Sequence, residues 1–193
     1  IGTNALSTVT SGNYNTACGM AAGLVLVSGA QNTLVGYKAL GGADAAESGN
    51  VMVGTFAGRH IDASAGTGAG SNNIGIGYGA LSGVNWSYSD GDTSQATKPS
   101  ADFNIGIGSY ALDGITTGNK NLAIGYGAGG TFNAGSGNVA LGHEALTSED
   151  ASGGCVAIGF EALKVQNTND SNNTAIGYQV GVALNGSTDS VHI

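Results

Sequence analysis

The residues best suited to contact another molecule gather in one stretch, residues 84–103, which holds the only Trp and the only Pro of the chain. Exposed aromatic rings flanked by polar groups suit contacts with a glycan or a protein surface. The alternative is a loop that packs on its own molecule or on a neighbouring subunit, with Trp86 as its anchor. The residues that we expect to contact a partner are Trp86, Tyr88, Asp90, Asp92 and Lys98.

Metal and cofactor chemistry has little support in the sequence. The segment from Asp90 to Ser94 places oxygen atoms at alternate positions, as a calcium loop does, but it lacks the later Gly and the bidentate Glu of an EF-hand. The alternative is an acidic turn. His60, His143 and His192 are too far apart in the chain's repeats for one metal site or one catalytic triad. We expect no metal and no cofactor.

Catalysis on a polysaccharide would need clustered carboxylates, or a base, in a groove. The 13 Asp and Glu residues are spread along the chain. Glu144 and Glu161 occupy equivalent repeat positions, and stacking would bring them about 5 Å apart. Stacked copies of one position favour a surface column over an active site. We therefore expect no enzyme, and a solenoid polysaccharide-degrading enzyme is the alternative from another class.

A short repeat must position all of these residues. It reads Asn-x-small-Ile-Gly-x-x-Ala-Leu/Gly, followed by about eight polar residues, and it is aligned on its central Gly. Successive central glycines are 17 or 18 residues apart except at two insertions, about residues 60–71 and 84–103. The central glycines are Gly2, Gly19, Gly36, Gly54, Gly77, Gly108, Gly125, Gly142, Gly159 and Gly177.

The repeat predicts an all-β fold. Seventeen residues are too few for a helical hairpin repeat, which needs about 33. Residues 138–142 alternate large and small at the two-residue period of a strand. Asn, Gly, Ser and Thr supply the turns. We expect a parallel β-solenoid or β-roll with about ten coils of 17–18 residues, two short strands per coil, forming a single repeat domain over residues 1–193.

Stacking of the coils would align equivalent residues in columns. We expect the Ile and Leu/Gly columns to fill the interior, and the Ala column to allow close approach of two backbone layers. The Asn column would form an amide ladder, or Asn would simply tolerate a left-handed corner. The ladder residues are Asn15, Asn32, Asn50, Asn73, Asn104, Asn121, Asn138 and Asn173, with Ile76, Ile107, Ile124, Ile158 and Ile176.

Two further sets of residues follow from the columns. An aromatic column after the central Gly suggests a packing ladder or a sugar-stacking surface, and it contains Tyr37, Tyr78, Tyr126, His143, Phe160 and Tyr178. Cys18 and Cys155 would lie seven coils, or about 34 Å, apart, whereas a disulfide requires Cα atoms within about 7 Å. We expect both to be buried thiols.

The motifs from Asn173 to Gln179 and from Asn121 to Ala128 resemble the Asn-Ser-Val-Ala-Ile-Gly head repeat of trimeric autotransporter adhesins. The longer form ending Tyr-x-Ala-Leu, at residues 37–40 and 78–81, is similar to repeats of phage tail fibres. The resemblance implies a left-handed, homotrimeric β-roll in an extracellular fibre that contacts a cell. The 17-residue period favours the tail-fibre variant over the bacterial adhesin head.

Composition agrees with such a fibre. Thin coils enclose few apolar side chains, which favours lateral association of identical chains, most simply a homotrimer. A net charge of -8 with only five Lys and Arg disfavours nucleic-acid partners. The sequence contains no run of about 20 apolar residues, so we expect no membrane insertion of this segment. We expect a fragment of a longer fibre on a virion or bacterial surface, with a host cell-surface glycan or protein as its partner.

Overall fold

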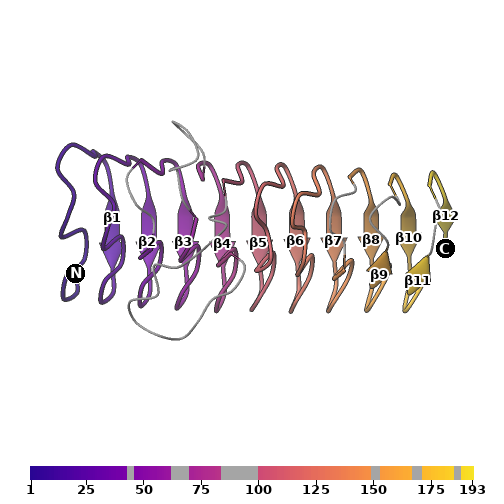
Figure 1. The fold of residues 1–193 in the computed structure, drawn as a ribbon. Coiled ribbons are helices and arrows are strands. Elements are labelled where there is room, and N and C mark those ends of the chain that lie inside the picture. The colour runs from indigo at the N-terminus through magenta and orange to yellow at the C-terminus, as the bar shows by residue number, and fades with distance from the viewer. Residues whose placement is uncertain (43–45, 62–69, 84–99, 149–152, 167–170, 185–187) are drawn as a thin grey trace.

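The computed structural model describes residues 1–42, 46–61, 70–83, 100–148, 153–166, 171–184 and 188–193. The chain forms a parallel β-solenoid in which one strand of each coil joins a ten-stranded sheet along the rod (Figure 1). The strands of this main sheet are β1 (Thr16–Cys18), β2 (Thr33–Val35), β3 (Val51–Val53), β4 (Ile74–Ile76), β5 (Ile105–Ile107), β6 (Leu122–Ile124), β7 (Val139–Leu141), β8 (Val156–Ile158), β10 (Thr174–Ile176) and β12 (Val191–His192).

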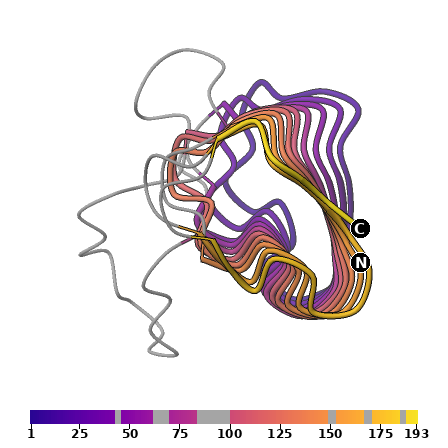
Figure 2. The same cartoon turned by 90° about the vertical axis from the view of Figure 1, so that its right-hand side faces the viewer.

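The strands pair in register throughout the main sheet. Ile74 of β4 pairs with Val51 of β3 and with Ile105 of β5, so the register continues across both longer spacings. The expected parallel stacking of equivalent residues is thus confirmed. The end-on view shows successive coils superposed around a common cross-section (Figure 2).

The prediction of two strands in every coil is wrong. Among the described residues, a second strand occurs only at β9 (Val165–Gln166) and β11 (Ala183–Leu184), which pair with each other. In most coils, the second and fourth residues after the central Gly have positive φ, as Glu144 and Leu146 do at 50° each. Two left-handed residues so close together bend the backbone into tight turns instead of an extended strand.

The central Gly is required by the spacing between coils. Gly19 through Gly159 in this series have φ between 130° and 143°. A Cβ on Gly125 would lie 2.3 Å from the carbonyl oxygen of Gly142 in the next coil. Because real Cβ atoms do not approach an oxygen so closely, any side chain here would push two coils apart.

The Ile column faces outward, which corrects the expectation that it fills the interior. Each three-residue strand directs only its middle residue inward, and Ala123, Ala140 and Ala157 are fully buried there. Ile76 and Ile124 retain 37% and 40% exposure. Ile107, Ile158 and Ile176 occupy the same outward position. The period of two was read correctly, but the middle residue of each strand lies inside. It is Ala in β6, β7, β8 and β10, and it is the fully buried Leu34 in β2 and Met52 in β3.

The Ala and Leu columns are buried, as expected. Ala22, Ala39, Ala57, Ala80, Ala111, Ala128, Ala145 and Ala162 are fully buried, as are Leu40, Leu81, Leu112, Leu146 and Leu163.

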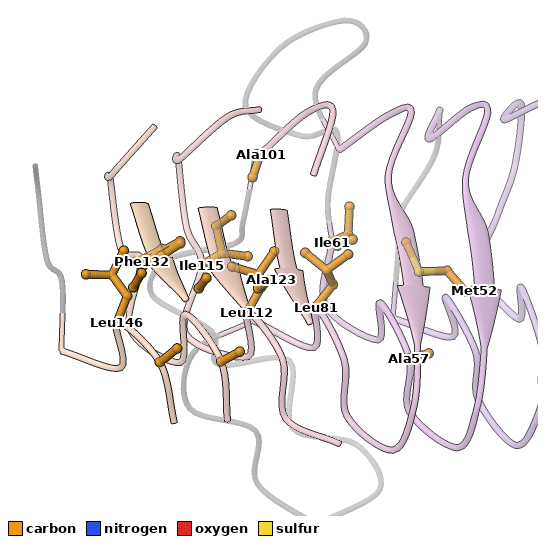
Figure 3. Close-up of a cluster of buried hydrophobic side chains, with 14 of the residues drawn as sticks. Met52, Ala57, Ile61, Leu81, Ala101, Leu112, Ile115, Ala123, Phe132 and Leu146 are labelled. Atoms are coloured by element: carbon orange, nitrogen blue, oxygen red, sulfur yellow. The ribbon is translucent and has the colours of Figure 1, made fainter. Parts of the chain in front are cut away.

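A further core column went unrecognised in the sequence, seven residues after the central Gly, and it includes Leu26, Ile61, Ile115 and Phe132. Some of these side chains are drawn together in Figure 3. Phe132 compensates for the missing side chain of Gly129, because a Cβ on Gly129 would lie 2.9 Å from its ring.

The Asn ladder forms, but chiefly from side chain to backbone. The Oδ1 atom of Asn121 accepts from the backbone N–H of Asn138 at 2.9 Å, and its Nδ2 donates to the carbonyl of Gly135 at 2.8 Å. Asn15, Asn32, Asn50, Asn73, Asn104, Asn138 and Asn173 likewise accept from the next coil. The alternative, a left-handed Asn, is wrong: Lys120, just before Asn121, has the positive φ of 60°.

The Gly contact gives a direct test of the stacking. We expect Gly125→Ala to lower the free energy of unfolding by at least about 3 kcal/mol, because its Cβ would collide with backbone and not with a movable side chain. Gly137→Ala is the matched control, since Gly137 also has positive φ but its Cβ would meet nothing within 4 Å. The control should cost about 1 kcal/mol. Equal losses in the thermal or denaturant unfolding of the two variants would contradict this account.

Candidate functional site

The outward positions of the main sheet form a continuous apolar surface, which we call the outer apolar face. Its two columns are the first and third residues of each strand, and no outward strand position carries a charged side chain. The first column contains the apolar Val51, Ile74, Ile105, Leu122, Val139, Val156 and Val191, with Thr16, Thr33 and Thr174 nearer the ends of the sheet. The third contains Cys18, Val35, Val53, Ile76, Ile107, Ile124, Leu141, Ile158 and Ile176. Apolar patches of this continuity mark interaction surfaces.

A ladder of aromatic rings runs along the rod immediately after the central Gly. Its neighbouring ring centroids lie between 5.0 and 5.9 Å apart, and the order is Tyr37, Phe56, Tyr78, Tyr110, Tyr126, His143, Phe160 and Tyr178. The sequence column lacked Phe56 and Tyr110, because these two stand one residue further from their Gly. They close the gaps in coils where the first position carries Thr55 or Ser109.

The ladder changes geometry at Tyr126. From Tyr37 to Tyr126 the rings meet edge to face, with interplanar angles of 62° to 80°. From Tyr126 to Tyr178 they are stacked, with angles of 12° to 19°. The second half uses one repeat position throughout, so translation from coil to coil keeps its rings parallel. The first half alternates between two positions, which turns successive rings against each other.

Glu144 and Glu161 lie close together, as their spacing predicted, and Lys164 joins them. The Lys164 Nζ lies 2.6 Å from a carboxylate oxygen of each. Hydrogen bonds from Lys164 and then from Gln179 lower the pKa of Glu161, and the bond to Glu144, followed by that to Glu161, raises the pKa of Lys164. This arrangement favours the ionised form of Glu161. It suits a structural ion pair better than a general acid, which must hold its proton.

One hollow of about 340 Å³ opens beside the aromatic ladder. It lies where one coil has Gly at both the second and the fifth positions after its central Gly, namely Gly127 and Gly130. The coils on either side carry side chains at those positions. The hollow is lined by Tyr110, Asp113, Tyr126, Gly127, Gly130, Thr131, Glu144 and Thr147.

Asp113 contributes a half-buried carboxyl to this hollow. Burial raises the pKa of its carboxyl to about 6, although its own backbone N–H and that of Gly114 donate to it and partly oppose the shift. The ion pairs found among the described residues do not include Asp113. Sequence reasoning gave this residue no role, and the signal that marks it is the pair of glycines in the neighbouring coil.

The expected partner-contact residues Trp86, Tyr88, Asp90, Asp92 and Lys98 lie outside the described residues. The described part of the chain holds no group of three His, Cys, Asp or Glu side chains suited to a metal ion. Within that part, no helix is long and apolar enough to cross a membrane.

The two cysteines differ in their surroundings. Cys155 is buried as expected, and its backbone N–H donates to the Oδ1 of Asn138 at 2.9 Å, in the place of a ladder Asn. Cys18 is exposed, contrary to expectation, because it occupies the outward third position of β1. Neither forms a disulfide.

No protein-family model, curated protein or solved structure matches this chain. The likeness to adhesin and tail-fibre repeats therefore remains one of short motifs. The function of the chain is therefore inferred from its surfaces.

The half-buried carboxyl of Asp113 gives a pH-dependent test. Its folded pKa of about 6 lies above the ordinary Asp value of 3.8, so the native state holds the proton more tightly and loses stability as pH rises through this window. Asp113→Asn should therefore stabilise the chain by about 1–2 kcal/mol above pH 6 and by almost nothing below pH 4. Chemical denaturation at pH 3.5 and pH 8 measures this difference. A variant that is less stable at pH 8 would contradict it.

Proposed function

We propose that this chain is a structural and adhesive segment of an extracellular fibre built from three identical chains, most simply a phage tail fibre that contacts its host. In this proposal the chains are left-handed β-rolls packed around a common axis through their outer apolar faces. The head of a bacterial trimeric adhesin has the same physical design and is the alternative. The observation that carries the proposal is the uncharged apolar surface along the main sheet.

The dimensions of the outer apolar face favour a macromolecular partner. Ten strands about 4.8 Å apart extend over roughly 43 Å, and the three-residue strands give a width of about 10 Å. The resulting area, on the order of 400 Å², is comparable with the largest apolar patch on a typical monomer, and such patches are often functional. In its third column, Val35, Ile76, Ile124 and Ile176 retain between 37% and 41% exposure.

The periodicity of that face favours another copy of this chain. Its apolar side chains recur once per coil over the whole sheet, so a good partner needs the same spacing over the same length. A parallel copy of the chain meets that requirement at every coil. Closed symmetric assemblies of identical chains are also the common form of oligomer, and the motif resemblance favours a three-fold one.

The composition of the core supports the same conclusion. Each coil places Ala in two inward positions in much of the rod, for example Ala123 and Ala128, and adds few larger side chains such as Leu112 and Phe132. So thin a core buries little apolar surface for each residue ordered. Covering the outer apolar face would add burial without enlarging any coil.

The adhesive part of the proposal concerns the longer spacing between β4 and β5. Solenoid insertions commonly map to a binding face, and Trp86 and Tyr88 offer aromatic surface to a host glycan or protein. The regular rod would then act as the support, and the insertion would supply the specific contact.

The trimer is tested by Ile124→Asp. The substitution places a charge on the outer apolar face without altering the interior of the coil, so it should give folded monomers in analytical ultracentrifugation with an unchanged β-sheet circular dichroism spectrum. Thr117→Asp adds the same charge at an exposed corner away from the sheet and should leave the trimer intact. A trimeric Ile124→Asp protein, or a monomeric parent chain, would refute the proposed interface.

The adhesive role is tested by deleting residues 85–98, which restores a 17-residue spacing between Gly77 and Gly108. We expect an intact trimer of ordinary thermal stability that has lost at least tenfold in binding to bacterial cells and immobilised cell-surface glycans. Trp86→Ala should lose part of this binding. Unchanged binding after the deletion would move the contact elsewhere on the rod, while loss of the trimer would show that the insertion has a structural role.

A further inference from the structure

The hollow beside Tyr126 results from two missing side chains in a single coil. At the second position after the central Gly, other coils carry Lys38, Phe56, Glu144 and Glu161, all with positive φ. Gly127 has a φ of 61° like them, so the backbone itself does not demand Gly there. At the fifth position, the neighbouring coils carry Asp113 and Thr147 where this coil has Gly130.

A side chain at either glycine would have room for its Cβ atom. A Cβ on Gly127 would meet only the Glu144 side chain, at 3.5 Å. A Cβ on Gly130 would lie 3.3 Å from the carbonyl oxygen of Gly127, a tight contact, and at ordinary distances of 3.4 Å from Thr147 and 3.5 Å from the Oδ1 of Asp113. The flanking coils are two steps, or about 9.6 Å, apart. A compact group one coil thick fits between them.

The lining offers negative charge and aromatic rings. Asp113 and Glu144 lie on opposite sides of the coil that carries Gly127 and Gly130. The Lys164 Nζ, 2.6 Å from a carboxylate oxygen of Glu144, partly neutralises that second charge. Tyr110 and Tyr126 add two rings in edge-to-face contact, with centroids 5.7 Å apart. The hydroxyls of Thr131 and Thr147 already donate to the carbonyls of Thr147 and Glu144. The hollow therefore presents chiefly acceptors and π-surface.

We propose that this hollow binds an alkylammonium group, with Asp113 as its counter-ion and the rings of Tyr110 and Tyr126 against its alkyl substituents. A cation near an aromatic face is attracted to the ring quadrupole, and a partly desolvated carboxylate strengthens the attraction. An anion is excluded by the same charges. A neutral polyol could satisfy the acceptors, but it would leave the half-buried carboxylate without a counter-charge.

The site is independent of the proposed trimer. All of its lining residues follow the central Gly of their coils, so none belongs to the outer apolar face. Binding of a cation in the hollow requires neither the receptor nor the insertion. The experiments on the trimer and on the hollow can therefore fail independently of each other.

Choline chloride is the probe, and saturation-transfer NMR of its methyl protons on the full chain measures binding. The uncharged isostere 3,3-dimethyl-1-butanol is the matched ligand, and sodium chloride keeps the ionic strength equal. We expect saturable binding of choline at pH 8 and at least tenfold weaker binding of the isostere. Equal binding of the two ligands, or no saturation by choline, would overturn the proposal.

Three variants locate the site. Asp113→Asn should weaken choline binding at least tenfold, and Gly130→Thr should abolish it by copying the residue that the next coil carries at that position. Asp189→Asn removes the same charge from an exposed acid several coils away and should bind choline normally. Retained binding in Asp113→Asn, or equal losses in Asp189→Asn, would refute the assignment.

Proton competition provides an independent readout. The titratable groups that line the hollow with Asp113 are Tyr110, Tyr126 and Glu144, with Lys164 bound to Glu144 and His143 stacked on Tyr126. With a pKa of about 6, Asp113 is largely protonated at pH 5, so choline binding should fall roughly tenfold between pH 8 and pH 5. Asp113→Asn should lack this pH step. A step that persists in the variant would assign the titration to another group and contradict the role of Asp113.

Discussion

The close approach of one peptide layer to the next is the constraint on which this structure depends. At the central Gly, the carbonyl of the following coil occupies the place of a side chain, as the 2.3 Å separation at Gly125 shows. The ladder Asn fixes the same spacing from the other side of the strand, because its amide binds a backbone N–H one coil away and a carbonyl near the turn. Gly sets how near two coils lie, and Asn sets their register.

This constraint makes the interior uniform and leaves diversity to the outside. Inward positions are filled chiefly by Ala and Leu, and larger side chains such as Met52 and Phe132 occupy the space that a Gly leaves, as Phe132 does beside Gly129. Outward positions carry strand aliphatics on one face and aromatic rings beyond the Gly corner. The Lys164 ion pairs and the hollow at Gly127 lie there as well. Chemistry can thus change from coil to coil while the backbone path stays the same.

The stacking itself was predictable, because a repeat of Asn, Gly and Ala at fixed offsets makes sense only if like positions meet. Parallel register, the buried Ala and Leu columns and the proximity of Glu144 to Glu161 followed directly. The direction of the Ile column did not. Alternation gives two faces but does not say which is inside. The buried middle position holds Ala123 in β6 but Leu34 in β2 and Met52 in β3, so residue size alone does not identify it.

The candidate sites were harder to predict for other physical reasons. Phe56 and Tyr110 join the aromatic ladder from a neighbouring repeat position, which a strict alignment of columns overlooks. The hollow depends on two residues without side chains in a chain with 36 glycines, so its signal is an absence visible only when coils are compared. The burial of Cys18 was mispredicted for the same reason as the burial of the Ile column, since both occupy the outward third position of a strand.

The unbroken register across unequal spacings has a consequence for length. From β3 to β5, strands separated by quite different numbers of residues still pair position for position. The rod therefore measures distance in whole coils, about 4.8 Å each, whatever the chain does between them. Duplicating or losing one repeat would change the length of the rod by one coil spacing, while the order of residue types along each face stayed the same.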